Sequence, residues 1–308
     1  MPDVKVVGVD SLFGGYIDNV NRQVEFYKRD LAVQSVKDLF EKYRFDYVFH
    51  FAAYAAEGLS PFIRKYNYSN NVGSTVNIIN ECVNYGIKRL VYTSSMSVYG
   101  NGPRPGEIFT EDDPCAPIDP YGISKYACEM DIKVAGEQHG LDWCIIRPHN
   151  VFGVKQNIWD KYRNVLGIWI NNILHDRDIL IYGDGEQVRA FTYIDNILPC
   201  LAKAAFSAEA SRQTVNLGGM VPTTINAAAE MLCRITGYYR VKHAEKRHEV
   251  KFAVPSYQKS VDVLGYNEKF GVEYGLAEMW KWAKTQPDRG QYKWPEYEIS
   301  KGIYSYWK

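Results

Sequence analysis

Short apolar runs, rich in β-branched and aromatic residues, alternate with longer segments of helical periodicity in the first half of the chain. The runs that predict strands are residues 4–9, 24–27, 47–51, 90–93 and 143–147. Helices are predicted over residues 33–43, over a segment in which Val72, Val76, Ile79 and Val83 share one face, and over residues 121–139. Because strands buried on both faces read as continuous apolar runs, this alternation predicts a parallel α/β sheet.

The pattern becomes less regular after Asn150. Helices are predicted at residues 165–174, 225–236 and 274–284, with short strands at residues 179–182 and 214–217. We therefore expect residues 1–150 to form the sheet domain. We expect residues 151–308 to form mainly a smaller, mixed α/β lobe over the carboxyl edge of the sheet, with some segments that return to it.

Composition excludes several classes of protein. The 308 residues carry a formal net charge of zero and no long basic run, which disfavours nucleic acid or an anionic membrane as a partner. No apolar stretch approaches the roughly 20 residues that cross a bilayer, and the first ten residues lack the pattern of a secretory signal. The six cysteines occur singly, without metal-ligand spacing, which predicts a reduced, cytoplasmic protein with core thiols and no metal site.

The first predicted strand ends in Asp10, whereas a dinucleotide-binding sheet usually opens with a strand, a Gly-rich turn and a helix that binds pyrophosphate. An acid at the end of a strand is what the second strand of such a fold supplies. Gly14 and Gly15 follow, but no helix with a phosphate-binding start comes after them, so they predict a simple turn. The fold expected is a Rossmann-type, doubly wound parallel sheet. Our hypothesis is that this chain lacks its first strand and helix, which would leave a central place in the sheet open.

Tyr121 and Lys125 form the strongest chemical motif, since residues four apart lie on one face of a helix. An ammonium near a phenol lowers the phenol's pKa and suits it to act as a general base near neutral pH. Ser94 and Ser95 follow a predicted strand, where α/β sheets bind ligands, and a hydroxyl there can bridge a substrate hydroxyl and the phenol. The alternative for both serines is local hydrogen bonding in a turn.

At this point the chain resembles the extended short-chain dehydrogenase/reductase family of NAD-dependent epimerases and dehydratases, most closely its UDP-galactose 4-epimerase-like branch. The matching stretches run almost from end to end: Val9-Asp10 and residues 29–31, 50–53, 70–72, 93–100, 121–125, 147–153, 182–195, 216–219 and 247–251.

The resemblance implies NAD as the cofactor, a nucleotide sugar as the substrate and a homodimer as the assembly. The residues implied in cofactor binding are Asp10, Asp30, Leu31, Phe51, Ala52, Ala53, Asn71, Tyr121 and Lys125. Tyr121 would be the base, Lys125 its partner and Ser95 the bridging hydroxyl. The residues implied in substrate binding are Ser95, Asn150, Asn164, Arg189, Arg247 and Glu249. For Arg189 or Arg247 taken alone, a surface ion pair is the alternative.

The residues after Ser95 bear on the reaction. Relatives that dehydrate the sugar carry an Asp-Glu pair there, and the decarboxylases typically carry a Glu at the second position, whereas this chain has Met96 and Ser97. The resemblance therefore favours a UDP-hexose 4-epimerase that oxidises C4 transiently and returns the hydride. A dehydratase, decarboxylase or reductase of the same family stays open, as does a non-catalytic fragment that cannot hold NAD. Ala253 would border the sugar's C2 pocket and leave room for an N-acetyl group.

Overall fold

The computed structural model describes residues 4–102, 106–247 and 249–307. Its centre is a four-stranded parallel sheet in the order β10-β5-β4-β3. These strands are β3 (Tyr47–His50), β4 (Arg89–Thr93), β5 (Trp143–Pro148) and β10 (Gln213–Leu217). Alternate residues of β4 and β5 point to opposite faces, and both faces are buried, as their continuous apolar sequences predict.

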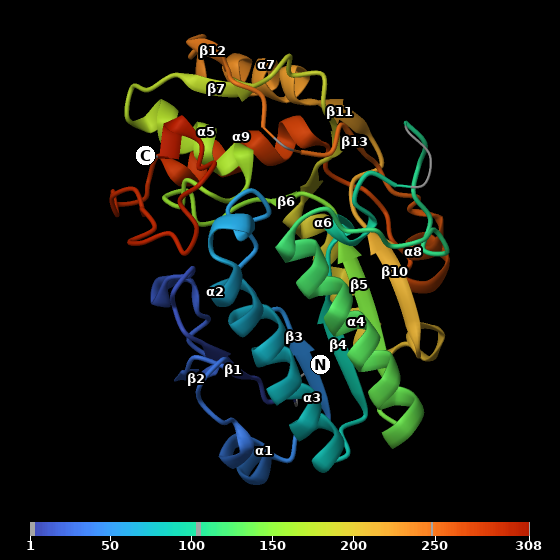
Figure 1. Ribbon diagram of the computed structural model, residues 1–308. Coiled ribbons are helices and arrows are strands. Elements are labelled where there is room, and N and C mark those ends of the chain that lie inside the picture. Colours follow the sequence, from blue (N-terminus) through green and yellow to red (C-terminus); the bar gives the residue numbers. More distant parts are fainter. Residues whose placement is uncertain (1–3, 103–105, 248, 308) are drawn as a thin grey trace.

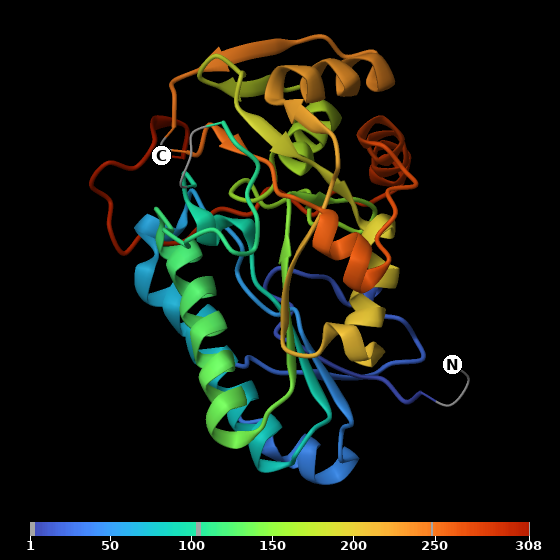
Figure 2. The same cartoon turned by 90° about the vertical axis from the view of Figure 1, so that its right-hand side faces the viewer.

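Helices cover both faces of this sheet (Figure 2). One face packs against α3 (Ser74–Asn84) and α4 (Pro120–His139), and the other against α6 (Ile194–Phe206) and α8 (Gln258–Leu264). The short helix α2 (Arg64–Tyr68) continues through a π-helical turn, η3 (Ser69–Gly73), directly into α3. This doubly wound arrangement confirms the predicted α/β fold class.

Strands β1 (Val7–Asp10) and β2 (Glu25–Lys28) form a separate two-stranded parallel sheet. It lies beyond β3 with helix α1 (Lys37–Tyr43) (Figure 1). In the described part of the chain no strand joins β1 to β3, which is where the resemblance places the first strand. Side-chain packing of the α1 segment against α3 connects the two sheets, while Phe49 and Phe51 at the β3 edge remain 37% and 50% exposed.

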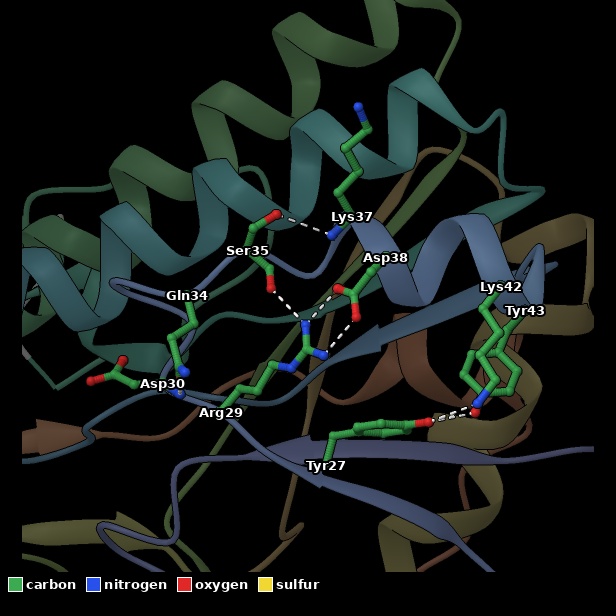
Figure 3. Close-up of polar contacts among 9 residues, drawn as sticks. All are labelled: Tyr27, Arg29, Asp30, Gln34, Ser35, Lys37, Asp38, Lys42 and Tyr43. Atoms are coloured by element: carbon green, nitrogen blue, oxygen red, sulfur yellow. Dashed lines mark hydrogen bonds and ion pairs between the residues drawn. The ribbon is translucent and has the colours of Figure 1, made fainter.

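The predicted helix over residues 33–43 begins only at Lys37. Polar side chains hold the preceding residues in a turn: Asp30 Oδ1 accepts a hydrogen bond from Ala32 N, and Gln34 Oε1 accepts one from Asp30 N. Ser35 Oγ accepts from Lys37 N at 3.2 Å (Figure 3). Such local bonds compete with helix formation, which is why the helical pattern overstated the length of α1.

The smaller lobe packs around one apolar core that includes Trp169, Leu232 and Met279. Its helices are α5 (Val165–Leu174), α7 (Ile225–Thr236) and α9 (Val272–Ala283). Strand β7 (Ile179–Tyr182) pairs with β12 (Val241–Ala244), and β6 (Val151–Phe152) pairs with β9 (Thr192–Tyr193). A three-stranded sheet has β8 (Val188–Ala190) at its centre, flanked by β11 (Pro222–Thr224) and β13 (Phe252–Ala253). The bounds of α5, α7 and β7 are those predicted. None of the helices in the described ranges is long and apolar enough to cross a membrane.

The aromatic C-terminal segment, which showed no periodicity, folds back along α2 (Figure 1). Tyr292 and Trp294 pack around Phe13 together with Tyr54 and Tyr66. Edge-to-face ring contacts, rather than regular hydrogen bonding, therefore fix the C-terminal segment in place.

The remaining short 3-10 helices are η1 (Ile17–Asn19), η2 (Ser60–Phe62), η4 (Met96–Tyr99), η5 (Ala208–Ala210) and η6 (Ser305–Trp307).

Candidate active site

A cavity of about 750 Å³ opens at the carboxyl ends of β4 and β5, beneath the smaller lobe. It brings together most of the residues predicted for catalysis and substrate binding: Ser95, Tyr121, Asn150, Asn164, Arg189, Arg247 and Glu249. These residues come from segments up to about 150 positions apart, so the fold rather than local sequence assembles them. Open α/β sheets bind their ligands at this edge.

Tyr121 lies in the first turn of α4, where Asp119 caps the helix by accepting a hydrogen bond from Gly122 N at 2.9 Å. Gly122 is required there because a Cβ atom would lie 2.6 Å from the Ser97 carbonyl oxygen. Lys125 follows one turn later on the same side, with its Nζ 6.0 Å from the centroid of the Tyr121 ring. The structure therefore has the Tyr–Lys geometry on which the enzymatic interpretation depends.

Lys125 does not itself line the cavity but lies behind Tyr121. Its Nζ donates a hydrogen bond to the carbonyl oxygen of Thr93 at 2.7 Å and lies 4.9 Å from the Tyr92 ring centroid. Burial lowers the pKa of Lys125 to about 8. The side chain is thus a cation at neutral pH that loses its proton in mildly alkaline solution.

The low pKa expected for the phenol is not found in this structure. Burial raises the pKa of Tyr121 above its usual value, and the negative charge of Glu57 raises it further, while a hydrogen bond with Ser95 lowers it. The sequence pattern could not show that burial of the phenol outweighs the nearby ammonium. In this state Tyr121 is a neutral phenol hydrogen-bonded to Ser95.

The two serines after β4 have different surroundings. Ser94 Oγ donates to the buried carboxylate of Glu129, which also pairs with Arg147 at 2.7 Å. Ser94 thus belongs to a structural network in the core. Ser95 lines the cavity and caps η4, where its Oγ accepts a hydrogen bond from Ser97 N at 3.2 Å. Only Ser95 of this pair combines cavity exposure with a contact to Tyr121.

The two arginines predicted for the substrate reach the cavity from the smaller lobe. Arg189 pairs with Glu249 at 3.0 Å, so the ion pair weighed as an alternative does form, but it lies in the cavity wall. Arg247 stacks over the Tyr182 ring, 4.0 Å from its centroid. An arginine held on an aromatic face retains its charge and presents its edge to a ligand.

The predicted asparagines hold the cavity floor. Asn164 caps α5, where its Oδ1 accepts from Leu166 N at 2.9 Å and its Nδ2 donates to the Val151 carbonyl oxygen at 3.1 Å. Asn150 has a positive φ of 38°, a conformation that asparagine tolerates better than most residues. Both side chains line the cavity.

Two acidic residues of the cavity were not predicted. Glu57 and Asp119 line it near Tyr121, and both carboxylates raise the pKa of that phenol. Glu57 belongs to no motif and lies in the loop after β3. The available signal was its position after the carboxyl end of a predicted parallel strand, where ligand-binding loops usually lie.

A second cavity of about 250 Å³ lies between β1, β2 and the loop after β3. Its walls include the residues predicted for the adenosine and ribose: Asp10, Asp30, Leu31, Phe51, Ala52 and Ala53. Gly14 and Arg163 line both cavities, which are therefore adjacent. Asn71 is the exception, since it is buried and its Oδ1 accepts a hydrogen bond from Tyr54 N at 2.9 Å. Its neighbour Asn70 lines the cavity instead.

Arg29 also lines this smaller cavity, but its guanidinium is already paired with a carboxylate. The guanidinium donates two hydrogen bonds to the carboxylate of Asp38, at 2.5 and 2.6 Å, and a third to the Ser35 carbonyl oxygen (Figure 3). The bidentate pair raises the pKa of Arg29 and lowers that of Asp38. The cavity thus presents Asp10 and Asp30 beside a neutralised arginine.

The residues of the smaller cavity fit the adenosine end of NAD. The carboxylate of Asp10 at the end of β1 suits ribose hydroxyls, and the small side chains of Ala52 and Ala53 leave room along the path toward the larger cavity. In the described ranges β1 is followed by a turn and the short 3-10 helix η1 rather than by an α-helix, and Gly14 of that turn packs against Arg163, whose nitrogen would be 2.2 Å from an added Cβ. Arg163 is therefore a cation placed where the cavities meet.

The sequence model of the NAD dependent epimerase/dehydratase family matches residues 2–218. The chain belongs to this family. It is 29% identical over 287 residues to a putative UDP-glucose 4-epimerase of Methanocaldococcus jannaschii, with 91% of this chain and 90% of the relative covered. It is 28% identical over 296 residues to a UDP-glucuronate 4-epimerase of Thermodesulfobacterium geofontis, with 91% and 88% covered.

Among solved structures, a UDP-glucose 4-epimerase of Thermotoga maritima with UDP-glucose matches with a TM-score of 0.85 and 27% sequence identity, and the match covers 92% of both chains. The resemblance inferred from the motifs is therefore confirmed at the level of the family. The chain therefore has a Rossmann-type fold and is an enzyme of the nucleotide-sugar epimerase/dehydratase family.

Proposed function

We propose that this protein is an NAD-dependent nucleotide-sugar 4-epimerase that acts on a UDP-hexose by transient oxidation at C4. The observation that carries the proposal is one cavity in which Tyr121 and Ser95 lie with Arg189 and Arg247. Bound NAD would take a hydride from C4 of the sugar and return it, so that no net oxidation occurs. The residues of the smaller cavity would hold its adenosine part.

Tyr121 would accept the proton of the sugar's 4-hydroxyl and later return it, with Ser95 as the bridging hydroxyl. The buried phenol favours its neutral form, and only the phenolate can accept a proton, so positive charge nearby is needed to stabilise the phenolate. Lys125 supplies such a charge from 6.0 Å and keeps it below a pH of about 8. Its bond to Thr93 fixes the ammonium at the end of β4.

Arg189 and Arg247 would bind the diphosphate of the substrate, because guanidinium groups pair with phosphate oxygens in a bidentate geometry. Glu249 orients Arg189 through their 3.0 Å contact, and the ring of Tyr182 stacks against the guanidinium of Arg247. Asn150 and Asn164 line the same cavity and would supply amide contacts to the nucleoside and phosphate.

Dehydration of the sugar is the second candidate. The positions after Ser95 hold Met96 and Ser97, which carry no carboxylate for elimination of water. However, Glu57 and Asp119 place two carboxylates near Tyr121 from other elements, and this observation favours a dehydratase. The products distinguish the two reactions, since epimerisation conserves the mass of the sugar.

We propose that the protein is a cytoplasmic homodimer. Helices α3 and α4 lie side by side on one face of the molecule (Figure 1), with Val76, Met130 and Val134 exposed at 37%, 47% and 44%. A second copy of this helix pair would cover these apolar side chains in a four-helix bundle.

All six cysteines are unpaired and five are buried, which supports a reducing compartment.

The direct experiment supplies the purified protein with NAD and either UDP-glucose or UDP-galactose, and separates the products by chromatography. We expect each sugar to yield a mixture of both. Tyr121→Phe is the matched control and should stop the conversion. Appearance of a product lighter by one water, without interconversion, would instead support the dehydratase.

A further inference from the structure

We infer that Glu57 is a specificity-determining residue that selects an uncharged hexose over a hexuronate in the active-site cavity. This inference rests on the proposed function and names the substrate class that the site accepts. It concerns a distinction that the relatives themselves leave open, because one is a UDP-glucose 4-epimerase and another a UDP-glucuronate 4-epimerase.

The backbone of Glu57 is fixed to the start of the catalytic helix. Ser60 Oγ donates a hydrogen bond to the Glu57 carbonyl oxygen at 2.8 Å and accepts one from Tyr121 N at 3.1 Å. Leu59 and Ser60 are almost fully buried, so the loop is anchored on one side. The Glu57 side chain is exposed toward the cavity that it lines. Two consecutive hydrogen bonds therefore hold the backbone of Glu57 to the first turn of α4, and its carboxylate acts on the Tyr121 phenol by its charge.

Two carboxylates, Glu57 and Asp119, line the cavity near the reacting phenol. Glu57 and Asp119 both raise the pKa of Tyr121, and Arg163 lowers it. Arg163 is itself paired with Asp160 at 3.0 Å, as Arg189 is with Glu249. A substrate whose 4-hydroxyl met Tyr121 would bring its neighbouring C5 substituent close to these two carboxylates.

An uncharged hydroxymethyl group at C5 can donate a hydrogen bond to Glu57. A uronate carboxylate at the same position meets a like charge in a cavity of lowered dielectric constant, which is strongly unfavourable. A pocket that rejects one ligand through a repulsive group and accepts another through a hydrogen bond is specific by both means. The structure assigns the repulsive group to Glu57, because Asp119 is already engaged as the cap of α4.

The charge of Glu57 changes near neutral pH. Enclosure by the surrounding protein, followed by the charge of Asp119, raises the pKa of Glu57 to about 7, and Glu249 also raises it, whereas Arg189 and Arg247 lower it. Glu57 is neutral below this pH and ionised above it. The preference for the uncharged hexose should therefore strengthen as the pH rises from 6 to 8.

The test measures equilibrium binding of UDP-glucose and of UDP-glucuronate by calorimetry at pH 6 and pH 8, without added NAD. The variants are Glu57→Gln and, as a control with the same charge change, Glu137→Gln on the exposed side of α4. At pH 8 we expect the wild-type protein and Glu137→Gln to prefer UDP-glucose. Glu57→Gln should raise the affinity for UDP-glucuronate about tenfold or more and change that for UDP-glucose by less than about threefold.

An unchanged ratio of the two affinities in Glu57→Gln overturns the inference, as does a wild-type protein that binds both sugars equally at pH 8. Loss of turnover in Glu57→Gln with an unchanged binding ratio would also overturn it and make Glu57 an acid in the reaction. Selective binding of UDP-glucose without interconversion refutes the proposed epimerase but leaves the selectivity standing. Absence of binding for both ligands contradicts the two proposals together.

Discussion

The ammonium of Lys125 lies 6.0 Å from the centre of the Tyr121 ring and donates its hydrogen bond to the Thr93 carbonyl oxygen. One cation thus connects the end of β4 with the first turn of α4. Because the phenol is buried and its pKa is raised, positive charge nearby is needed to favour the phenolate, and Lys125 is positioned to supply it together with Arg163.

Activity should decline as the pH rises above about 8, since burial lowers the pKa of Lys125 to about that value and its ammonium is then lost. Lys125→Met removes the charge at every pH and should reduce kcat by roughly 10²-fold or more at pH 7. The measurement is the pH dependence of kcat with UDP-galactose in both proteins. An alkaline decline that persists in Lys125→Met would assign it to another group.

Asp38→Ala should weaken the discrimination against a 2′-phosphate on the adenosine ribose. Asp38 engages Arg29 through two hydrogen bonds, and its removal would free the guanidinium to meet a phosphate in the smaller cavity. The wild-type protein should bind adenosine 5′-monophosphate better than adenosine 2′,5′-bisphosphate, and Asp38→Ala should shift the ratio about threefold or more toward the bisphosphate.

The matched control for this experiment is Glu41→Ala, which removes a carboxylate from the same helix. Asp38 is 59% exposed, so its loss should change the stability of the fold only slightly. If both variants bind the two nucleotides in the wild-type ratio, the Arg29–Asp38 pair does not influence the choice of cofactor.

Ala253 should decide how large a C2 substituent the sugar can carry. It lines the larger cavity, is 2% exposed and packs with Met96, Tyr99 and Phe109. Ala253→Tyr should lower kcat/KM for UDP-N-acetylglucosamine more than that for UDP-glucose, and Ala253→Val tests the same effect with less risk of overpacking. Equal losses on both substrates would count against a role in sugar selection.

The assembly can be tested at the exposed apolar faces of α3 and α4. A charge at Met130 or Val134 would be buried without a partner in the proposed dimer, so Met130→Glu and Val134→Glu should shift the sedimentation coefficient to that of a monomer. Val221→Glu, at a position 60% exposed in the smaller lobe, is the control and should leave the dimer intact. A monomeric wild-type protein would refute the proposed assembly.

The elements with strong periodicity could be predicted from the sequence. The bounds of α5, α7 and β7 agree, because their apolar positions follow one period from end to end. Helix α6 was missed, since Pro199 lies inside it and proline usually ends a helix. The start of α1 was misplaced because Asp30, Gln34 and Ser35 bond to the local backbone.

The candidate site was predictable where spacing determines geometry. Tyr121 and Lys125 are four residues apart on a helix, so their proximity follows from the helix itself. The raised pKa of Tyr121 and the position of Glu57 depend on burial by segments far away in sequence. The side chain of Asn71 could equally face a cofactor or the core, and its partners Tyr54 and Ser124 place it in the core. Tertiary packing determines the pKa of Tyr121, the position of Glu57 and the orientation of the Asn71 side chain.

In the proposed reaction a hydride leaves C4 of the sugar and returns to the same carbon within one cavity. The most direct measurement gives the protein UDP-galactose labelled with deuterium at C4, together with NAD, in ordinary water and follows the products by mass spectrometry. We predict UDP-glucose that retains the deuterium at C4, and no conversion by Tyr121→Phe. Loss of the label to solvent, or a product that has lost water, would contradict the account.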